Sequence, residues 1–148
     1  MGRELRTVGI VGLGAMGSGI AQLAIEAGFE TIGREVELGR AEGARDTIAH
    51  FLTRKVEKGT LEQAARDEAV GRLRLATDLA DLADCDIVVE AAFEELGVKH
   101  ALFRELEAVV RDDTILASNT SALSVTEIAS VLTRPERAVG MHFFNPPL

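Results

Sequence analysis

The chain has 148 residues, 47% of them hydrophobic, which predicts a single domain with a substantial core. A formal net charge of −8 argues against nucleic acid or an anionic membrane as partner, and a lone cysteine, Cys85, excludes an intramolecular disulfide and a zinc–cysteine cluster. Because the first residues are charged and no run of 18 apolar residues occurs, we expect no secretory signal and no membrane span. We also expect no metal site and a cytoplasmic location.

The first predicted element is a buried strand at residues 7–11, followed by a glycine motif and a helix that runs to Gly28. In a dinucleotide-binding turn, Gly12 allows the tight bend, Gly14 lets a pyrophosphate approach the backbone, and Gly17 lets the helix pack closely. The free N–H groups and the dipole of the helix N-terminus favour phosphate there. The turn that we predict to bind the cofactor consists of Gly12, Leu13, Gly14, Ala15, Met16 and Gly17.

A second strand is predicted at residues 30–32, with Glu35 at or just past its end. A carboxylate at this position binds the ribose hydroxyls of NAD and repels the 2′-phosphate of NADP, so the sequence favours NAD. Arg34 weakens this inference because it could turn toward a 2′-phosphate, and the alternative for Glu35 is a solvated loop charge.

Two helices, at residues 36–57 and 61–70, interrupt the alternation of strands and helices. Arg54, Lys55 and Lys58 gather near the end of the first. One interpretation is favourable placement of cations at a helix C-terminus. The other is a binding site for an anionic part of a substrate.

Four more strands are predicted, at residues 73–76, 86–92, 114–117 and 138–141. The helix between the middle two is expected to bury Val98, Ala101, Leu102, Leu106 and Val109, and a capping box starts a short helix at residue 124. Alternation of strands and helices predicts an α/β fold, a doubly wound, Rossmann-like parallel sheet ordered 3-2-1-4-5-6.

In such sheets ligands bind beyond the carboxyl ends of the strands. That edge collects the glycine turn, Glu35, and residues 93–95, 118–121 and 142–145. Polar and titratable groups from five segments are therefore expected to converge there.

With these residues in place, nearly the whole chain resembles the NAD-binding domain of 3-hydroxyacyl-CoA dehydrogenases, of the 3-hydroxybutyryl-CoA type. The most specific similarities are the segments VVEAAFE at 88–94, ASNTS at 117–121 and GMHFFNP at 140–146. The resemblance implies NAD-dependent oxidation of a 3-hydroxyacyl-CoA to the 3-oxoacyl-CoA. It also implies that residues 1–148 form the NAD-binding domain and that the helical pair is the family's insertion.

By the same resemblance, Glu94, Lys99 and Asn145 match cofactor contacts near the nicotinamide half. Ser121 matches the serine that contacts the substrate hydroxyl and the cofactor, and His142 matches the catalytic histidine.

Lys58 matches a lysine that contacts coenzyme A. Three departures from the family pattern matter: Glu35 replaces the usual Asp, Gly33-Arg34 replaces a more apolar strand end, and Phe51 stands where a polar coenzyme A contact is found. The family's catalytic glutamate and its helical dimerisation domain, which would form a homodimer, are expected beyond Leu148.

The chemistry also fits the residues directly, because oxidation of a secondary alcohol needs a base, and histidine titrates near neutral pH. We assign Ser118 and Thr120 structural roles and place His50 and His100 at the surface. Two other interpretations stay open: a β-hydroxyacid-type dehydrogenase, suggested by residues 12–17, and a non-catalytic nucleotide-binding relative.

Overall fold

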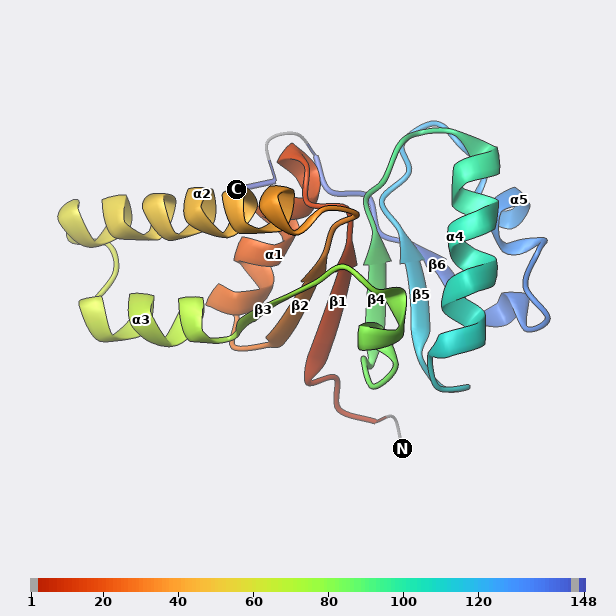
Figure 1. Cartoon of the computed structure of the whole chain (residues 1–148), viewed down its shortest axis with the longest axis horizontal. Coiled ribbons are helices and arrows are strands. Elements are labelled where there is room, and N and C mark those ends of the chain that lie inside the picture. Colours follow the sequence, from red (N-terminus) through yellow and green to blue (C-terminus); the bar gives the residue numbers. More distant parts are fainter. Residues whose placement is uncertain (1–2, 145–146) are drawn as a thin grey trace.

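A computed structural model describes residues 3–144 and 147–148 of the chain. Their strands form one parallel sheet in the order β3-β2-β1-β4-β5-β6, which confirms the predicted doubly wound topology (Figure 1). The carboxyl ends of all the strands lie at the same edge, the upper one in Figure 1. The strands are β1 (Thr7–Val11), β2 (Glu30–Arg34), β3 (Leu73–Ala76), β4 (Ile87–Glu90), β5 (Ile115–Ser118) and β6 (Ala138–Gly140).

Helices cover both faces of the sheet. One buried cluster joins β1 to α1, α2 and α3, and a second lies under α4, α5 and η1. The predicted helical pair, α2 and α3, is confirmed and extends as an arm beyond β3 in Figure 1. The helices are α1 (Ala15–Glu26), α2 (Leu38–Glu57), α3 (Gln63–Gly71), η1 (Leu79–Leu82), α4 (Leu96–Val109), α5 (Val125–Ala129) and η2 (Pro135–Arg137).

Two sequence-based expectations need correction. Strand β4 ends at Glu90 and not at residue 92, because the N–H of Ala92 donates to the Glu90 carboxylate at 2.7 Å instead of continuing the ladder. On α4 the expected Leu106 is buried and Leu102 and Val109 pack against the core, but Ala101 is exposed, and Lys99 and Phe103 are buried instead. A charged residue, Lys99, therefore lies in the core beside the apolar residues that the spacing indicated.

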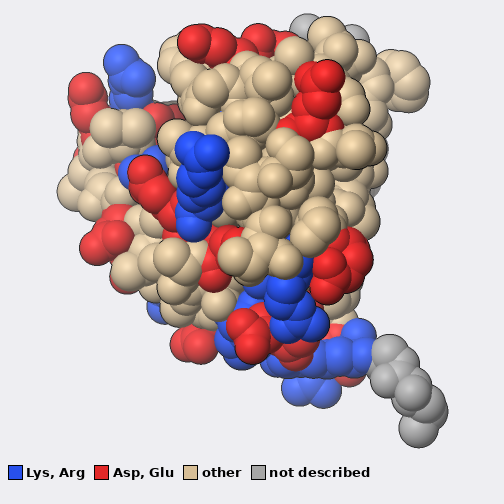
Figure 2. All heavy atoms as spheres, turned by 90° about the vertical axis from the view of Figure 1, so that its right-hand side faces the viewer, with Lys and Arg blue, Asp and Glu red and all other residues tan. Residues whose placement is uncertain are grey.

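The amino-terminal edge of the sheet is held together by a buried carboxylate. Asp86 accepts hydrogen bonds from the backbone N–H groups of Arg6 (2.8 Å) and Thr7 (3.0 Å), and the guanidiniums of Arg3 and Arg111 lie at 2.9 and 2.8 Å. Figure 2 shows acidic and basic side chains densely mixed at this lower end of the molecule. The network anchors the start of β1 to β4.

Among the helices of the described residues, none is both long and apolar enough to cross a membrane.

Candidate cofactor and substrate site

The turn from β1 into α1 has the geometry that a pyrophosphate cradle requires. Gly12 adopts φ +94°, and a Cβ there would lie 2.9 Å from the Ala91 carbonyl oxygen. A Cβ on Gly17 would lie 1.7 Å from the carbonyl oxygen of Gly12, so the helix approaches its own strand too closely for any side chain. At Gly14 a Cβ would meet no atom within 4 Å, which leaves room for a ligand beside the backbone. These three positions match the distinct roles expected of them.

The first turn of α1 is suited to hold an anion. The helix begins at Ala15 with Gly14 as its N-cap, and the first intrahelical bond runs from the Ser18 N–H to the Gly14 oxygen at 2.9 Å. The amides of Ala15, Met16 and Gly17 therefore precede the helical ladder and are available to a ligand. The residues present fit the phosphates of a dinucleotide.

Glu35 lies directly beside this turn. Its Oε2 accepts a hydrogen bond from the Leu13 N–H at 2.9 Å, and its Oε1 accepts one from Val36 at 3.1 Å. The carboxylate is thus half-buried at the carboxyl end of β2, adjacent to the glycine turn. Arg34 instead donates through Nε to the Thr77 carbonyl oxygen at 2.9 Å. This bond holds Arg34 against the loop after β3.

The unusual Gly33 has a packing explanation. A Cβ at this position would lie 2.9 Å from Cδ1 of Leu13, so the leucine side chain occupies the space that a larger strand residue would fill. Leu13 is 7% exposed, and the glycine turn rests on β2 through this contact.

Glu94 is the centre of a second group of polar side chains. Its carboxylate accepts hydrogen bonds from the Thr120 hydroxyl at 2.5 Å, and from the N–H and hydroxyl of Ser121 at 3.0 and 3.3 Å. Burial alone would raise the pKa of Glu94, but the Thr120 and Ser121 hydrogen bonds and the nearby Lys99 cation outweigh it and hold the pKa below its usual value. The Glu94 carboxylate, which is partly exposed, thus joins the loop after β4 to the loop after β5.

Lys99 lies behind Glu94 and is only 1% exposed. Its Nζ donates to both oxygens of the Glu90 carboxylate at 2.7 and 2.6 Å and lies 3.6 Å from Glu94 Oε1. Ser118 also donates to Glu90, at 2.6 Å. The sequence analysis missed Glu90 because this residue lies at the end of an apolar strand. It also assigned Ser118 and Thr120 only structural roles, whereas the Ser118 hydroxyl donates to Glu90 and the Thr120 hydroxyl donates to Glu94.

His142 is exposed just beyond β6, with its ring centroid 5.0 Å from that of Phe144. The segment is fixed by the Met141 N–H donating to the Ser118 oxygen at 3.0 Å and by the Phe143 N–H donating to Asn119 Oδ1 at 2.9 Å. The register pairs Ser118 with Gly140, so Ser121 and His142 follow neighbouring strands at the same edge. The predicted cofactor contact Asn145 lies outside the described residues.

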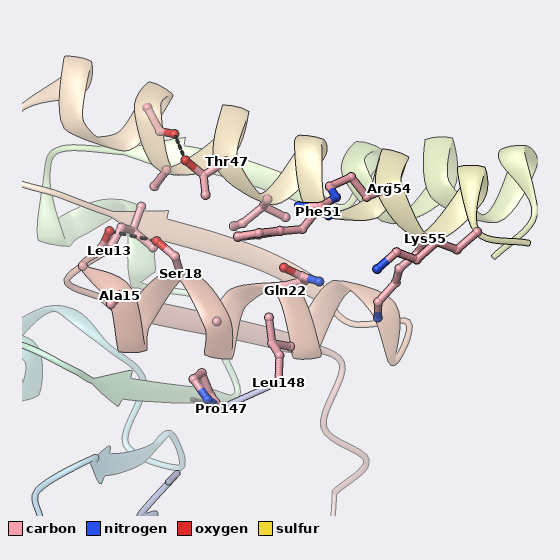
Figure 3. A pocket seen from close by; sticks show the side chains of 16 residues that line it. Leu13, Ala15, Ser18, Gln22, Thr47, Phe51, Arg54, Lys55, Pro147 and Leu148 are labelled. Carbon is pink, nitrogen blue, oxygen red and sulfur yellow. Dashed lines mark hydrogen bonds between the residues drawn. The ribbon is translucent and has the colours of Figure 1, made fainter. Parts of the chain in front are cut away.

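A groove of about 870 Å³ runs between α1 and α2, starting at the glycine turn (Figure 3). In Figure 3 Gln22 of α1 faces Phe51 of α2, and Lys55 lies toward the far end. Arg54 and Lys58 also line the groove. The Lys55 ammonium is paired with Glu26 at 2.7 Å. The groove is therefore apolar in its middle, around Ile48 and Phe51, and basic at the end that Arg54 and Lys58 line.

The family model described as "3-hydroxyacyl-CoA dehydrogenase, NAD binding domain" matches residues 7–148. A 3-hydroxybutyryl-CoA dehydrogenase of Bradyrhizobium diazoefficiens is 42% identical over 146 residues, which is 99% of this chain and 50% of that protein. One of Mycobacterium tuberculosis is 42% identical over 147 residues, or 99% of this chain and 51% of that protein.

The crystal structure of 3-hydroxybutyryl-CoA dehydrogenase from Escherichia coli superimposes with a TM-score of 0.96 at 39% identity, covering 98% of this chain and 31% of that one. The chain spans about half the length of the curated relatives described above. The sequence left three interpretations open, and these matches favour the 3-hydroxyacyl-CoA dehydrogenase domain over the β-hydroxyacid-type dehydrogenase and the non-catalytic nucleotide-binding relative.

Proposed function

Since the chain belongs to the family of 3-hydroxyacyl-CoA dehydrogenase NAD-binding domains, we propose that it supplies the cofactor half of an enzyme that interconverts 3-hydroxyacyl-CoA and 3-oxoacyl-CoA. The observation that carries the proposal is the meeting of the glycine turn, Glu35, the Glu94 network and His142 at one edge of the sheet. A dinucleotide that extends across this edge reaches from the phosphate cradle at β1 toward the polar loops that follow β4, β5 and β6.

The adenosine half of the cofactor is assigned to Glu35, and NAD is preferred over NADP. The carboxylate is held 2.9 Å from the Leu13 N–H, in the position where it accepts hydrogen bonds from ribose hydroxyls and repels a 2′-phosphate. Arg34 donates through Nε to the Thr77 carbonyl oxygen, which directs this side chain toward the loop after β3.

The nicotinamide half is assigned to Glu94, Lys99, Ser121 and Asn145. Bound NAD supplies the hydride acceptor. His142 acts as the base that takes the hydroxyl proton of the substrate and, in the reverse direction, as the acid that returns it. Ser121 orients the substrate oxygen, because its hydroxyl lies at the same edge and its own N–H is fixed by Glu94.

The groove between α1 and α2 is assigned to the coenzyme A part of the substrate. Lys58 and Arg54 place positive charge at its far end, and the apolar middle suits the chain of an acyl thioester. The Phe51 side chain, 45% exposed, forms part of the wall in place of a polar contact.

We also propose that residues 1–148 are the NAD-binding domain and that turnover requires a helical second domain and the carboxylate partner of His142. An imidazole that is held by a carboxylate has a fixed tautomer and a stabilised cation. That second domain is expected to form a homodimer, and the enzyme to be cytoplasmic and to bind neither nucleic acid nor membranes.

Calorimetric titration of the 148-residue chain with NADH and NADPH tests the proposal, alongside NADH oxidation with acetoacetyl-CoA. We expect NADH to bind, NADPH to bind more weakly, and turnover to be poor without the second domain. Absence of NADH binding by a folded chain would remove the basis of the proposal. Rapid turnover by these 148 residues would show that no second domain is needed.

A further inference from the structure

The side chain of Gln22 is a polar group in the apolar middle of the groove between α1 and α2. Gln22 lines the groove although the residue is only 1% exposed, and it faces Phe51 of α2 (Figure 3). The facing wall also includes Ala44 and Ile48, which are both buried. An apolar side chain of this size would pack at position 22 without the cost of desolvating an amide. The amide therefore contributes something other than packing.

The direction of the Gln22 amide is set by two charged residues. Its Nε2 donates to Glu26 Oε2 at 3.3 Å, and Lys55 Nζ donates to Glu26 Oε1 at 2.7 Å. Because an ionised carboxylate only accepts hydrogen bonds, the amide nitrogen faces Glu26 and the amide oxygen faces the opposite way. In Figure 3 the oxygen lies on the side of Phe51 and the nitrogen on the side of Lys55. The ion pair between Glu26 and Lys55 thus orients the Gln22 oxygen into the groove.

The Gln22 oxygen is an acceptor that a ligand can use. In the part of the chain that the structure describes, no group donates to Gln22 Oε1. The hydroxyls of Ser18 and Thr47, nearer the glycine turn, donate to the backbone oxygens of Leu13 and Gly43 at 2.9 and 3.0 Å. A ligand that fills the middle of the groove must therefore bring an N–H or O–H group to Gln22, since an apolar ligand would bury this oxygen without a partner.

Coenzyme A carries amide groups in the arm that joins its thiol to its nucleotide, and amide N–H groups are donors of the required kind. We propose that Gln22 is a specificity-determining residue, whose Oε1 accepts a hydrogen bond from an amide N–H of this arm where the arm passes between Gln22 and Phe51. The inference rests on the proposed assignment of the groove to coenzyme A. It explains how a groove with Phe51 in its wall holds a polar arm, because the polar contact comes from α1 on the opposite side.

The test compares Q22M with the wild-type sequence in a protein that carries this domain together with the rest of the length of its relatives. The substrates are acetoacetyl-CoA, acetoacetyl-pantetheine, which has the amides but no nucleotide, and the S-propyl thioester of acetoacetate, which has neither. We expect Q22M to lower kcat/KM for the two amide-containing substrates by about 2- to 12-fold. The loss should be absent with the S-propyl thioester, and the dissociation constant for NADH should not change. A merely structural role would affect all the substrates together or none.

The matched control is Q63M. Gln63 of α3 also donates through Nε2 to an acid four residues later, Asp67, at 3.0 Å, but it is exposed and does not line the groove. Q63M should leave kcat/KM for every substrate unchanged. E26L/K55M serves as a second variant that keeps Gln22 and removes the ion pair that orients it, and it should lower kcat/KM for acetoacetyl-pantetheine by about two- to fivefold.

An equal loss with acetoacetyl-pantetheine and with the S-propyl thioester, or no loss with either, overturns the inference in a folded Q22M protein. If Q22M does not fold, an unchanged kcat/KM for acetoacetyl-pantetheine in E26L/K55M does so. R54A/K58A tests the groove itself, and it should raise the KM for acetoacetyl-CoA much more than the KM for acetoacetyl-pantetheine. If R54A/K58A changes neither value, the assignment of the groove to coenzyme A is wrong. If it raises the KM for acetoacetyl-CoA and Q22M has no effect, only the role of Gln22 is wrong.

Discussion

Replacing Glu35 with alanine should weaken NADH binding and relax the preference for NADH over NADPH. In the structure the Glu35 carboxylate accepts one hydrogen bond from the glycine turn, at 2.9 Å from Leu13, and one from Val36. A carboxylate oxygen has room for more than one donor, so ribose hydroxyls can be added without removing the bond to the turn.

The magnitude follows from the loss of hydrogen bonds to a charged acceptor. Such a bond contributes about 1.5–3 kcal/mol, and about 1.4 kcal/mol corresponds to tenfold in affinity. Loss of one ribose bond therefore weakens NADH by about 10- to 150-fold. NADPH should lose less or gain, because removal of the negative charge relieves its repulsion of the 2′-phosphate.

Calorimetric titration of the wild-type protein, E35A and E35Q with both cofactors measures these changes. E35Q keeps an acceptor near the Leu13 N–H but lacks the charge, so it should recover part of the NADH affinity and still accept NADPH. E37A is the matched control, since Glu37 is an exposed acid two residues away whose carboxylate pairs only loosely with Arg40 at 3.8 Å. Equal binding of NADH and NADPH by the wild-type protein would refute the reasoning and assign the choice to Arg34.

Three further predictions concern stability and reactivity. G17A places a Cβ 1.7 Å from the Gly12 oxygen, so urea unfolding should show a loss of at least about 1–3 kcal/mol together with loss of NADH binding; a stable, NADH-binding G17A protein would contradict the close packing. Burial raises the pKa of the Cys85 thiol to about 11, so a thiol reagent at pH 8 should label it only after unfolding, and rapid labelling of the native protein would contradict its burial. Burial would raise the pKa of Asp86, but two backbone hydrogen bonds and Arg111 outweigh it and lower the pKa. The stabilisation by Asp86 is therefore complete above about pH 4 and is lost as the pH falls through the lower pKa of the folded protein. Between about pH 5 and pH 2 the free energy of unfolding, measured with urea, should fall more steeply in the wild-type protein than in D86N, and equal slopes would refute this.

The sheet and the cofactor turn could be predicted because each depends on local sequence. A strand followed by Gly12, Gly14 and Gly17 has few alternative conformations, and the structure confirms a tight turn, an open position and a close helix contact at these residues. Gly28, which follows the end of α1, adopts φ +98°, a conformation that glycine tolerates at a helix end.

The Glu90–Lys99 pair could not be predicted, because its surroundings include residues that are distant in sequence and that only the fold brings together, such as Ser118 beside Glu90. Charged residues are almost never fully buried unless they are paired, so the apolar spacing that indicated Leu106 for the buried side of α4 did not indicate Lys99. Only the pairing of β4 with β5, which places Ser118 against Glu90, shows where the Lys99 charge is accommodated. The roles of Ser121 and His142 came from the family resemblance and stay predictions.

The measurement that tests the account most directly is NADH oxidation with acetoacetyl-CoA by a protein that carries this domain together with the rest of the length of its relatives, compared with its H142A variant. The account predicts that turnover falls by about 10²- to 10⁴-fold while the dissociation constant for NADH stays unchanged, because His142 handles the proton and the cofactor is held by other residues. Turnover by H142A at close to the wild-type rate would contradict the assignment of His142 and, with it, the proposed chemistry of this edge of the sheet.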